Sequence, residues 1–205
     1  MAGEVILKAL RHVWLTLESL KVPAAVMGGI GLAAWKYVRA TRDIDLLVNI
    51  HGHDLATILR QLQAAEIRPK SDRPTTSLGK LDVIQLLYQP PDAFVDVQID
   101  VFTSESEYHG KALERRVQMR LSDLDVQIAV LTCEDLILHK LLAGRIIDRA
   151  DTAALLRANR ESLDLRYLLH WVAHLDLATQ FAEVWSEALP GERMPPLDRS
   201  AADFE

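Results

Sequence analysis

The stretch GGIGLAAWKYVRATRDIDLLV, residues 28–48, joins a pair of glycines to two aspartates that are one residue apart. Side chains alternate along a strand at about 3.3 Å per residue, so Asp43 and Asp45 are expected on one face, about 6.6 Å apart along the backbone. Like charges held this close repel by roughly 2–4 kcal/mol at an effective dielectric near 20. The pair therefore predicts a bound cation at the start of an apolar strand.

The two glycines predict what accompanies the cation. Gly28 and Gly29 by themselves indicate a tight turn. Placed before a helix, they also let a polyphosphate approach the amide donors at the N-terminus of that helix. Together with Asp43 and Asp45, they favour a phosphate chain bound beside the cation.

A third carboxylate is expected from a later strand. In AFVDVQIDVF, residues 93–102, Val95, Val97, Ile99 and Val101 alternate with polar residues. Asp96 and Asp100 share the polar face, and either would complete an oxygen cage for Mg²⁺ or Mn²⁺. We favour Asp100 because it lies at the end of the strand, where a site would open to solvent, and Asp96 is its rival.

The pattern of apolar residues predicts a mixed α/β core followed by helices. Helices are expected over 4–20, 30–38, about 55–62 and 104–115, and strands over 23–27, 43–49, 81–88, 93–102, 117–121 and 126–131. The strands 81–88 and 93–102 should form a hairpin, and 67–80 should be a loop. Thr132 is expected to cap the first of four further helices, over 133–143, 148–158, 164–174 and 177–188.

The domain prediction follows from this order of elements. Residues 1–131 should form an α/β core with a mixed α+β sheet, residues 132–189 a C-terminal helical bundle, and residues 190–205 a flexible tail. The chain has 205 residues and a net charge of −6, which disfavours nonspecific nucleic-acid binding. No apolar run approaches the roughly 18–20 residues of a membrane span. We expect a cytoplasmic protein without a membrane partner.

Three other patterns are given less weight. Gly29, Gly31 and Ala34 fit a dinucleotide-binding fingerprint, but the acids here precede the apolar residues of the second strand, whereas a ribose-binding acid follows them. The histidine pair His170 and His174 has metal-binding spacing but no third ligand. Cys133 opens a helix, which could lower its thiol pKa, yet no partner base accompanies it.

The chain resembles the polymerase-β-like nucleotidyltransferase superfamily and, more closely, the AbiEii-type nucleotidyltransferases, many of them toxins of toxin–antitoxin pairs. Their pattern GG-x-A-x(n)-R-x-T-x-D-I-D-L is met by Gly28, Gly29, Arg39, Thr41, Asp43, Ile44, Asp45 and Leu46. A second motif is met by CEDLILHKLLAGRIIDRADTAALL, which supplies Lys140, Arg145, Asp148 and Asp151. The resemblance covers most of residues 22–175. Gly31 stands where alanine is common, and Lys36 where many relatives have glycine.

The resemblance implies a metal-dependent transfer of a nucleoside monophosphate from an NTP to a hydroxyl of RNA, tRNA or protein. An antitoxin protein is then an expected partner. The implied catalytic and metal-binding residues are Asp43, Asp45 and Asp100. The implied nucleotide-binding residues are Gly28, Gly29, Arg39, Thr41 and Lys140, with Arg145, Asp148 and Asp151 in support. Two alternatives stay open: an antibiotic-type small-molecule adenylyltransferase, and a non-catalytic nucleotide-binding or scaffold protein of the same fold.

Overall fold

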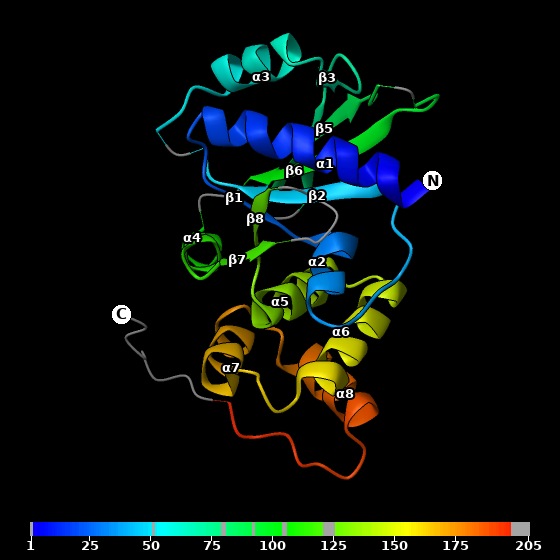
Figure 1. The fold of residues 1–205 in the computed structure, drawn as a ribbon. Coiled ribbons are helices and arrows are strands. Elements are labelled where there is room, and N and C mark those ends of the chain that lie inside the picture. Colours follow the sequence, from blue (N-terminus) through cyan, green and yellow to red (C-terminus); the bar gives the residue numbers. More distant parts are fainter. Residues whose placement is uncertain are drawn as a thin grey trace. The chain divides into compact units, whose positions relative to one another are not determined.

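The computed structural model describes residues 2–50, 52–78, 81–91, 93–103, 106–120 and 126–197. The contacts divide the chain into two compact units (Figure 1). The first comprises residues 1–31 and 40–131, and the second comprises residues 32–39 and 132–205. Residues 32–39, which the sequence placed in the α/β core, therefore make most of their contacts with the helical unit. The division into catalytic and helical domains stays a prediction.

The first unit is built on a mixed sheet in the strand order β3-β5-β6-β2-β1-β8-β7, with β4 also pairing with β5. The parallel pairs are β2 with β6 and β1 with β8, and the other neighbours are antiparallel. The strands are β1 (Ala24–Val26), β2 (Asp43–Val48), β3 (Arg68–Pro69), β4 (Thr75–Leu78), β5 (Leu81–Tyr88), β6 (Val97–Thr103), β7 (Val117–Arg120) and β8 (Gln127–Val130).

One face of this sheet is covered by helix α1 (Ala2–Ser19), which packs on β2 and β6 (Figure 1). The His12 ring stacks on Tyr88 with a centroid distance of 4.3 Å. Tyr88 shares its face with Ile99 and Ile44, which the strand register places in one layer and which are fully buried. The acids Asp43 and Asp45 alternate with these residues, so they lie on the opposite face of the sheet.

Three further helices belong wholly or partly to this unit: α2 (Gly28–Ala34), α3 (Leu55–Ala64) and α4 (Glu107–Glu114). Helix α3 is capped by Asp54, whose carboxylate accepts from the amides of Ala56 and Thr57. Helix α2 begins at Gly28, two residues before the predicted start, and ends at Ala34 rather than residue 38. Gly28 has a φ of +59°, so the predicted turn occurs at the first residue of the helix itself.

Two sequence-based expectations about strands were wrong. The segment 67–80 was predicted to be a loop, yet it contains β3 and β4, whose backbones pair with the edge of β5. Strand β6 begins at Val97 rather than residue 93, and Val95 is 65% exposed instead of sharing the buried face. The hairpin of β5 and β6 is present, with Tyr88 opposite Val97. Some residues of the predicted segments lie outside the described residues, namely 79, 80, 104, 105 and 121. The same holds for residues 198–205 of the predicted tail.

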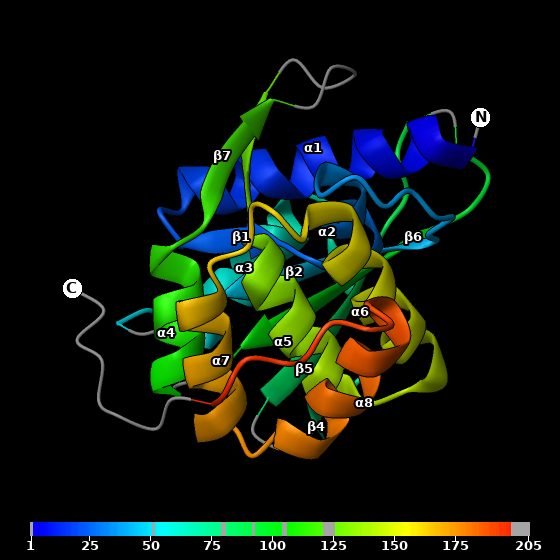
Figure 2. The same ribbon diagram turned by 90° about the horizontal axis from the view of Figure 1, so that it is seen from below.

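The second unit contains α5 (Cys133–Ala143), α6 (Ile146–Asn159), α7 (Leu165–His174) and α8 (Ala178–Ala188), which Figures 1 and 2 show gathered together. The predicted cap of α5 is present, because the Thr132 hydroxyl accepts from the Asp135 amide at 3.2 Å and donates to its carboxylate at 2.6 Å. Residues Cys133–Leu141 of α5 are all buried. No described helix has both the length and the apolar character that a membrane span requires.

Candidate active site

Three carboxylates gather on the sheet face that α1 leaves uncovered. One oxygen from each of Asp43, Asp45 and Asp100 lies within 4.8 Å of the others, and all three residues are partly exposed. The register explains the grouping, because Asp45 lies directly opposite Asp100 in the parallel pair of β2 and β6. The structure thus brings together two aspartates that are two positions apart in the sequence with a third that lies 55 positions after Asp45.

Asp45 is fitted against the first glycine of α2. A Cβ atom at position 28 would lie 2.5 Å from Cγ of Asp45 and would overlap its carboxylate. The Asp45 carbonyl also accepts a hydrogen bond from the Met27 amide at 2.9 Å. Gly28 is therefore required by the position of Asp45 as well as by its own positive φ.

Asp43 is held by a threonine that is fitted against the second glycine. The Thr41 hydroxyl donates to Oδ1 of Asp43 at 2.7 Å. A Cβ atom at position 29 would lie 2.6 Å from Cβ of Thr41. Gly29 thus makes room for the residue that orients Asp43. Gly28, Gly29 and Thr41, predicted as nucleotide-binding residues, all lie directly against the acids.

Asp100 is held by two neutral amides. Nε2 of Gln98 donates to the two carboxylate oxygens at 2.9 and 3.0 Å, and Nε2 of Gln85 lies 3.4 Å from Oδ1. Burial raises the pKa of the Asp100 carboxyl, and the nearby Asp43 charge adds to that rise, whereas the hydrogen bonds from Gln98 and Gln85 and the charge of Lys70 act against it. The net upward shift makes Asp100 a stronger base than an ordinary aspartate.

Asp96, the rival third ligand, is not part of this cluster. It precedes β6, and its two carboxylate oxygens accept from Nη2 of Arg68 at 2.9 and 2.8 Å. A carboxylate clamped by a guanidinium is already neutralised, so it is a poor partner for a further cation. Among the two candidates, the geometry favours Asp100.

The remaining predicted residues form an ion-pair network inside the second unit. Nζ of Lys140 lies 2.9 Å from Asp148 and 3.0 Å from Asp151, and Arg39 lies 3.1 Å from Asp151. Both aspartate side chains are fully buried, and the Lys140 side chain is 8% exposed. Lys140 is therefore neither a solvated surface lysine nor an unpaired cation. The role of Arg39 and Lys140 in binding a triphosphate stays a prediction.

Arg145 completes the network at the start of α6. Its side chain donates to Asp148 at 2.6 and 3.1 Å, and its backbone amide donates to the same carboxylate at 3.2 Å. Burial acts to raise the pKa of Asp148, but the hydrogen bonds from Arg145 and Lys140 outweigh it and lower the pKa. Asp148 is thus held ionised, and the supporting role of Arg145, Asp148 and Asp151 stays a prediction.

Three residues of the site were not singled out by sequence reasoning: Gln85, Gln98 and Lys70. Nζ of Lys70 donates to Oε1 of Gln98 at 2.7 Å. The alternation of β6 already placed Gln98 on the face of Asp100, two residues away. Lys70 and Gln85 become neighbours of Asp100 only through strand pairing, which no short-range pattern reveals.

The acidic cluster fits a divalent cation by the chemistry of its donors. Mg²⁺ and Mn²⁺ prefer carboxylate oxygens, and three of them converge here. A divalent cation would also relieve the repulsion among Asp43, Asp45 and Asp100. Asp43 is oriented by the Thr41 hydroxyl and Asp100 by neutral amides, groups that leave the negative charge of each acid in place. Asp43, Asp45 and Asp100 are therefore the residues that would hold the metal.

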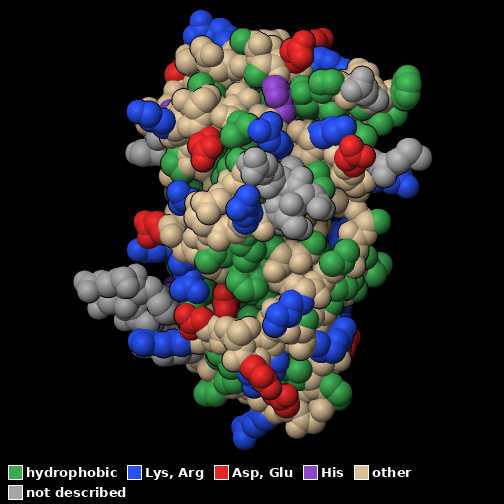
Figure 3. All heavy atoms as spheres, viewed as in Figure 1, with side chains coloured by type: hydrophobic (Ala, Val, Ile, Leu, Met, Phe, Trp, Pro, Cys, Tyr) green, Lys and Arg blue, Asp and Glu red, His purple; other side chains and the backbone are tan. Residues whose placement is uncertain are grey.

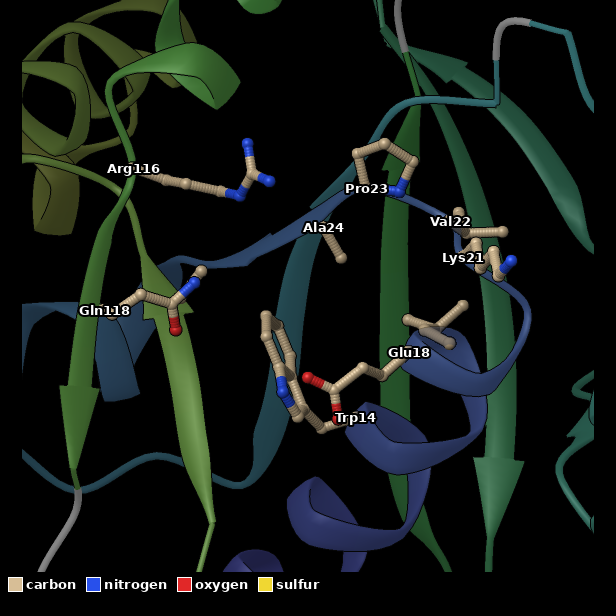
Figure 4. A pocket seen from close by; sticks show the side chains of 10 residues that line it. Trp14, Glu18, Lys21, Val22, Pro23, Ala24, Arg116 and Gln118 are labelled. Carbon is tan, nitrogen blue, oxygen red and sulfur yellow. The ribbon is translucent and has the colours of Figure 1, made fainter.

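Two other features lie apart from this cluster. A hollow of about 220 Å³, in which Trp14, Glu18, Arg116 and Gln118 are prominent, opens at the start of β1, whereas Gly28 follows the end of that strand (Figure 4). Cys133 is 2% exposed, and burial together with Glu134 raises its pKa to about 12, against a smaller opposing effect of Lys36. The suggestion that the helix start lowers this pKa was wrong, because the loss of hydration dominates.

The surface charge is mixed. On the face drawn in Figure 3, lysine and arginine side chains are interspersed with aspartate and glutamate, as a net charge of −6 leads one to expect. The described part of that face therefore offers no broad patch of a single sign.

Comparison with known proteins identifies the family. The family model described as "Nucleotidyl transferase AbiEii toxin, Type IV TA system" matches residues 8–203. Among solved structures, a presumed nucleotidyltransferase from Helicobacter pylori is 15% identical with a TM-score of 0.50, covering 96% of this chain and 85% of that chain. ANT(2″)-Ia in complex with adenylyl-2″-tobramycin is 12% identical with a TM-score of 0.51, covering 86% and 98%.

At such identities, these two structures show a shared fold alone. No curated protein matches the chain. The family model, in contrast, spans nearly the whole sequence and includes both motifs and all three clustered aspartates. The chain therefore belongs to the AbiEii family of nucleotidyltransferases.

Proposed function

We propose that this nucleotidyltransferase moves a nucleoside monophosphate from an NTP to an acceptor hydroxyl and that Asp43, Asp45 and Asp100 carry the reaction. The observation that supports the proposal is the convergence of these three partly exposed carboxylates within 4.8 Å, on the sheet face opposite α1. Carboxylate oxygens that converge in this way are suited to holding a divalent metal beside the substrate.

A divalent metal, Mg²⁺ or Mn²⁺, would neutralise charge on the triphosphate and on the departing pyrophosphate. Asp43 and Asp45 would hold it from one strand and Asp100 from the next. The acceptor oxygen forms a bond to the α-phosphorus while the bond from that phosphorus to the pyrophosphate oxygen breaks. Positioning and charge neutralisation supply most of the catalysis in such transfers.

Asp100 is proposed to receive the proton of the attacking hydroxyl. Its raised pKa makes it a better general base than an ordinary aspartate. Gln98 and Gln85 hold the carboxylate while leaving it anionic. The proton then passes to solvent, and pyrophosphate and the nucleotidylated acceptor are released.

The proposed acceptor is a hydroxyl of RNA, such as tRNA, or of a protein, and the proposed biological role is that of a toxin restrained by an antitoxin protein. The family description supports this role, since it names a toxin of a toxin–antitoxin system. We further propose that the protein acts in the cytoplasm, where NTPs and such acceptors are found.

The test is incubation with each α-labelled NTP, Mg²⁺ or Mn²⁺, and a cellular RNA or protein pool. Label should enter one pool with the wild-type chain and not with Asp45→Asn. Asp96→Asn should retain transfer, which also tests the rival third ligand. Failure of every NTP to label either pool, together with no Asp45-dependent growth inhibition, would overturn the proposal. Resistance profiling of cells that express the chain covers the small-molecule alternative.

A further inference from the structure

We propose that Gln98 is the positioning residue for Asp100 and that Lys70 acts on this acid through Gln98. The inference rests on the proposed function, because it assigns the third acid a catalytic task. Two consecutive contacts support it, from Lys70, which follows β3, to Gln98 in β6, and from Gln98 to Asp100 in the same strand.

The contact with Lys70 decides which end of the Gln98 amide faces the acid. An amide can present either its oxygen or its nitrogen to a neighbour. A lysine ammonium has donors alone, so the 2.7 Å contact with Lys70 requires the amide oxygen at that side. The amide NH₂ must then face Asp100, where it lies 2.9 and 3.0 Å from the carboxylate oxygens. Lys70 thereby fixes the orientation of the group that holds the acid.

Asp96 and Asp100 differ in how a neighbouring cation reaches them. Lys70 and Arg68 both come from the β3 segment, and each bonds to a residue of the β6 segment. Arg68 contacts Asp96 directly and neutralises it. Lys70 contacts a neutral amide instead, so its charge acts on Asp100 from a distance rather than through an ion pair. Because Gln98 lies between Lys70 and Asp100, the Asp100 carboxylate is oriented and can still bind a divalent cation.

The backbone that carries Lys70 is held by the sheet. The Lys70 amide donates to the carbonyl of Gln85 at 2.9 Å, and Gln85 lies opposite Asp100 in the β5–β6 register. Asp100 in turn lies opposite Asp45. The backbone that presents Lys70 is therefore anchored in the same row of the sheet as two of the three acids. The group that orients Asp100 is built on paired strands, which restricts its movement.

The experiment compares Gln98→Met, Lys70→Met and the double variant with the wild-type chain. Removing an outer partner of a metal-binding carboxylate typically costs about 10–100-fold in metal affinity or activity. We expect Gln98→Met to weaken Mn²⁺ binding, measured by EPR without substrate, by about tenfold or more. It should lower kcat by a similar factor while the KM for NTP changes much less.

Lys70→Met should show a smaller loss in the same two measurements. The double variant should be little worse than Gln98→Met, because Lys70 orients Asp100 through the amide alone and the direct effect of its charge is the smallest of those acting on this acid. Arg68→Met is the matched control: it also removes a β3 cation from β6, and it should leave Mn²⁺ affinity and kcat unchanged. Far-UV circular dichroism and Tm in EDTA verify that each variant folds.

Wild-type Mn²⁺ affinity and kcat in folded Gln98→Met would overturn the positioning role. Additive losses in the double variant would show that Lys70 acts independently of Gln98 and would overturn the second part. Asp45→Asn separates this proposal from the proposed function. If it abolishes Mn²⁺ binding while Gln98→Met has no effect, the positioning role alone fails; if it binds Mn²⁺ normally, the metal site fails and the positioning role with it.

Discussion

Gly28 lies so close to Asp45 that a methyl group at position 28 would overlap the Asp45 carboxylate. A Cβ atom at position 28 would lie 2.5 Å from Cγ of Asp45, although 17 positions separate the two residues in the sequence. The close approach arises because β1 and β2 are antiparallel neighbours, so the chain leaving β1 passes the start of β2. The glycine is thus tied to the position of a proposed metal-binding acid.

Gly28→Ala is expected to displace the Asp45 carboxylate and to lose nucleotide transfer and Mn²⁺ binding. The substitution also places alanine at a φ of +59°, which costs about 1–2 kcal/mol in backbone strain. Gly52→Ala is the matched control, because its φ is +78° and a Cβ atom there would meet nothing within 4 Å. Isothermal titration with Mn²⁺ checks the prediction. Equal Mn²⁺ affinities for the two variants would contradict a specific role for the Gly28–Asp45 contact.

Asp45→Asn is expected to abolish transfer and, without metal, to leave the fold as stable or more stable. Three carboxylates within 4.8 Å repel one another, and removal of one charge relieves part of that repulsion. A gain of about 1 kcal/mol would raise Tm by roughly 2–4 °C in a chain of this size. The wild-type Tm should rise on adding Mg²⁺, and the variant Tm should not.

Differential scanning fluorimetry with EDTA and with Mg²⁺ gives both comparisons. Asp96→Asn serves as the reference, since Asp96 is paired with Arg68 and should retain the wild-type response to Mg²⁺. A lower Tm for Asp45→Asn in EDTA would contradict the repulsion argument. A Mg²⁺ response that Asp45→Asn retains in full would contradict the metal site.

The sequence predicted what depends on local periodicity. Asp43 and Asp45 could be assigned to one face because strand alternation has a period of two, and Thr132 could be assigned to a cap because its partner Asp135 is three residues away. The order of helical and strand patterns predicted the fold class. The glycine–aspartate motif indicated the nucleotidyltransferase family.

What the sequence could not provide was strand register. The contact of Lys70 with Gln98 depends on β3 pairing with β5 and β5 with β6, and β3 has two residues with no apolar alternation. Similarly, the choice between Asp96 and Asp100 depended on Arg68, which comes from a segment interpreted as a loop. Long-range pairing is set by the packing of the whole sheet rather than by nearby residues.

His109 should make the protein lose stability as the pH falls from neutrality. Burial lowers its pKa from 6.5 to about 4, and its side chain is 4% exposed, with Nδ1 lying 2.5 Å from the Ser106 hydroxyl. Between these two values the unfolded chain binds a proton that the folded chain does not, so the free energy of unfolding rises with pH across the window. When fully expressed, this lowering of the His109 pKa contributes about 3 kcal/mol to the free energy of unfolding.

Urea unfolding of the wild type and His109→Gln at pH 7.0, 6.0, 5.0 and 4.5 checks this expectation. The wild type should lose more free energy of unfolding than the variant over this range, because the variant lacks the titrating ring. His53→Gln, at an exposed position, is the control and should follow the wild-type profile. Parallel profiles for wild type and His109→Gln would show that the buried imidazole does not contribute.

Asp148→Asn should destabilise the second unit more than removal of a surface ion pair. The Asp148 side chain is fully buried and accepts from both Lys140 and Arg145, so its loss leaves the Lys140 charge with less compensation. Breaking a buried pair in this way costs about 3–5 kcal/mol. Because the pKa of Asp148 is lowered, its contribution should be fully present above the ordinary value of 3.8 and lost as the pH falls through the lowered pKa.

Urea unfolding at pH 5 and pH 8 should therefore give the same difference between wild type and variant. Arg149→Met, which breaks the exposed pair with Glu183 and Glu187, should cause a smaller loss. A larger loss for Arg149→Met than for Asp148→Asn would mean that the buried network is not the main electrostatic support of these helices.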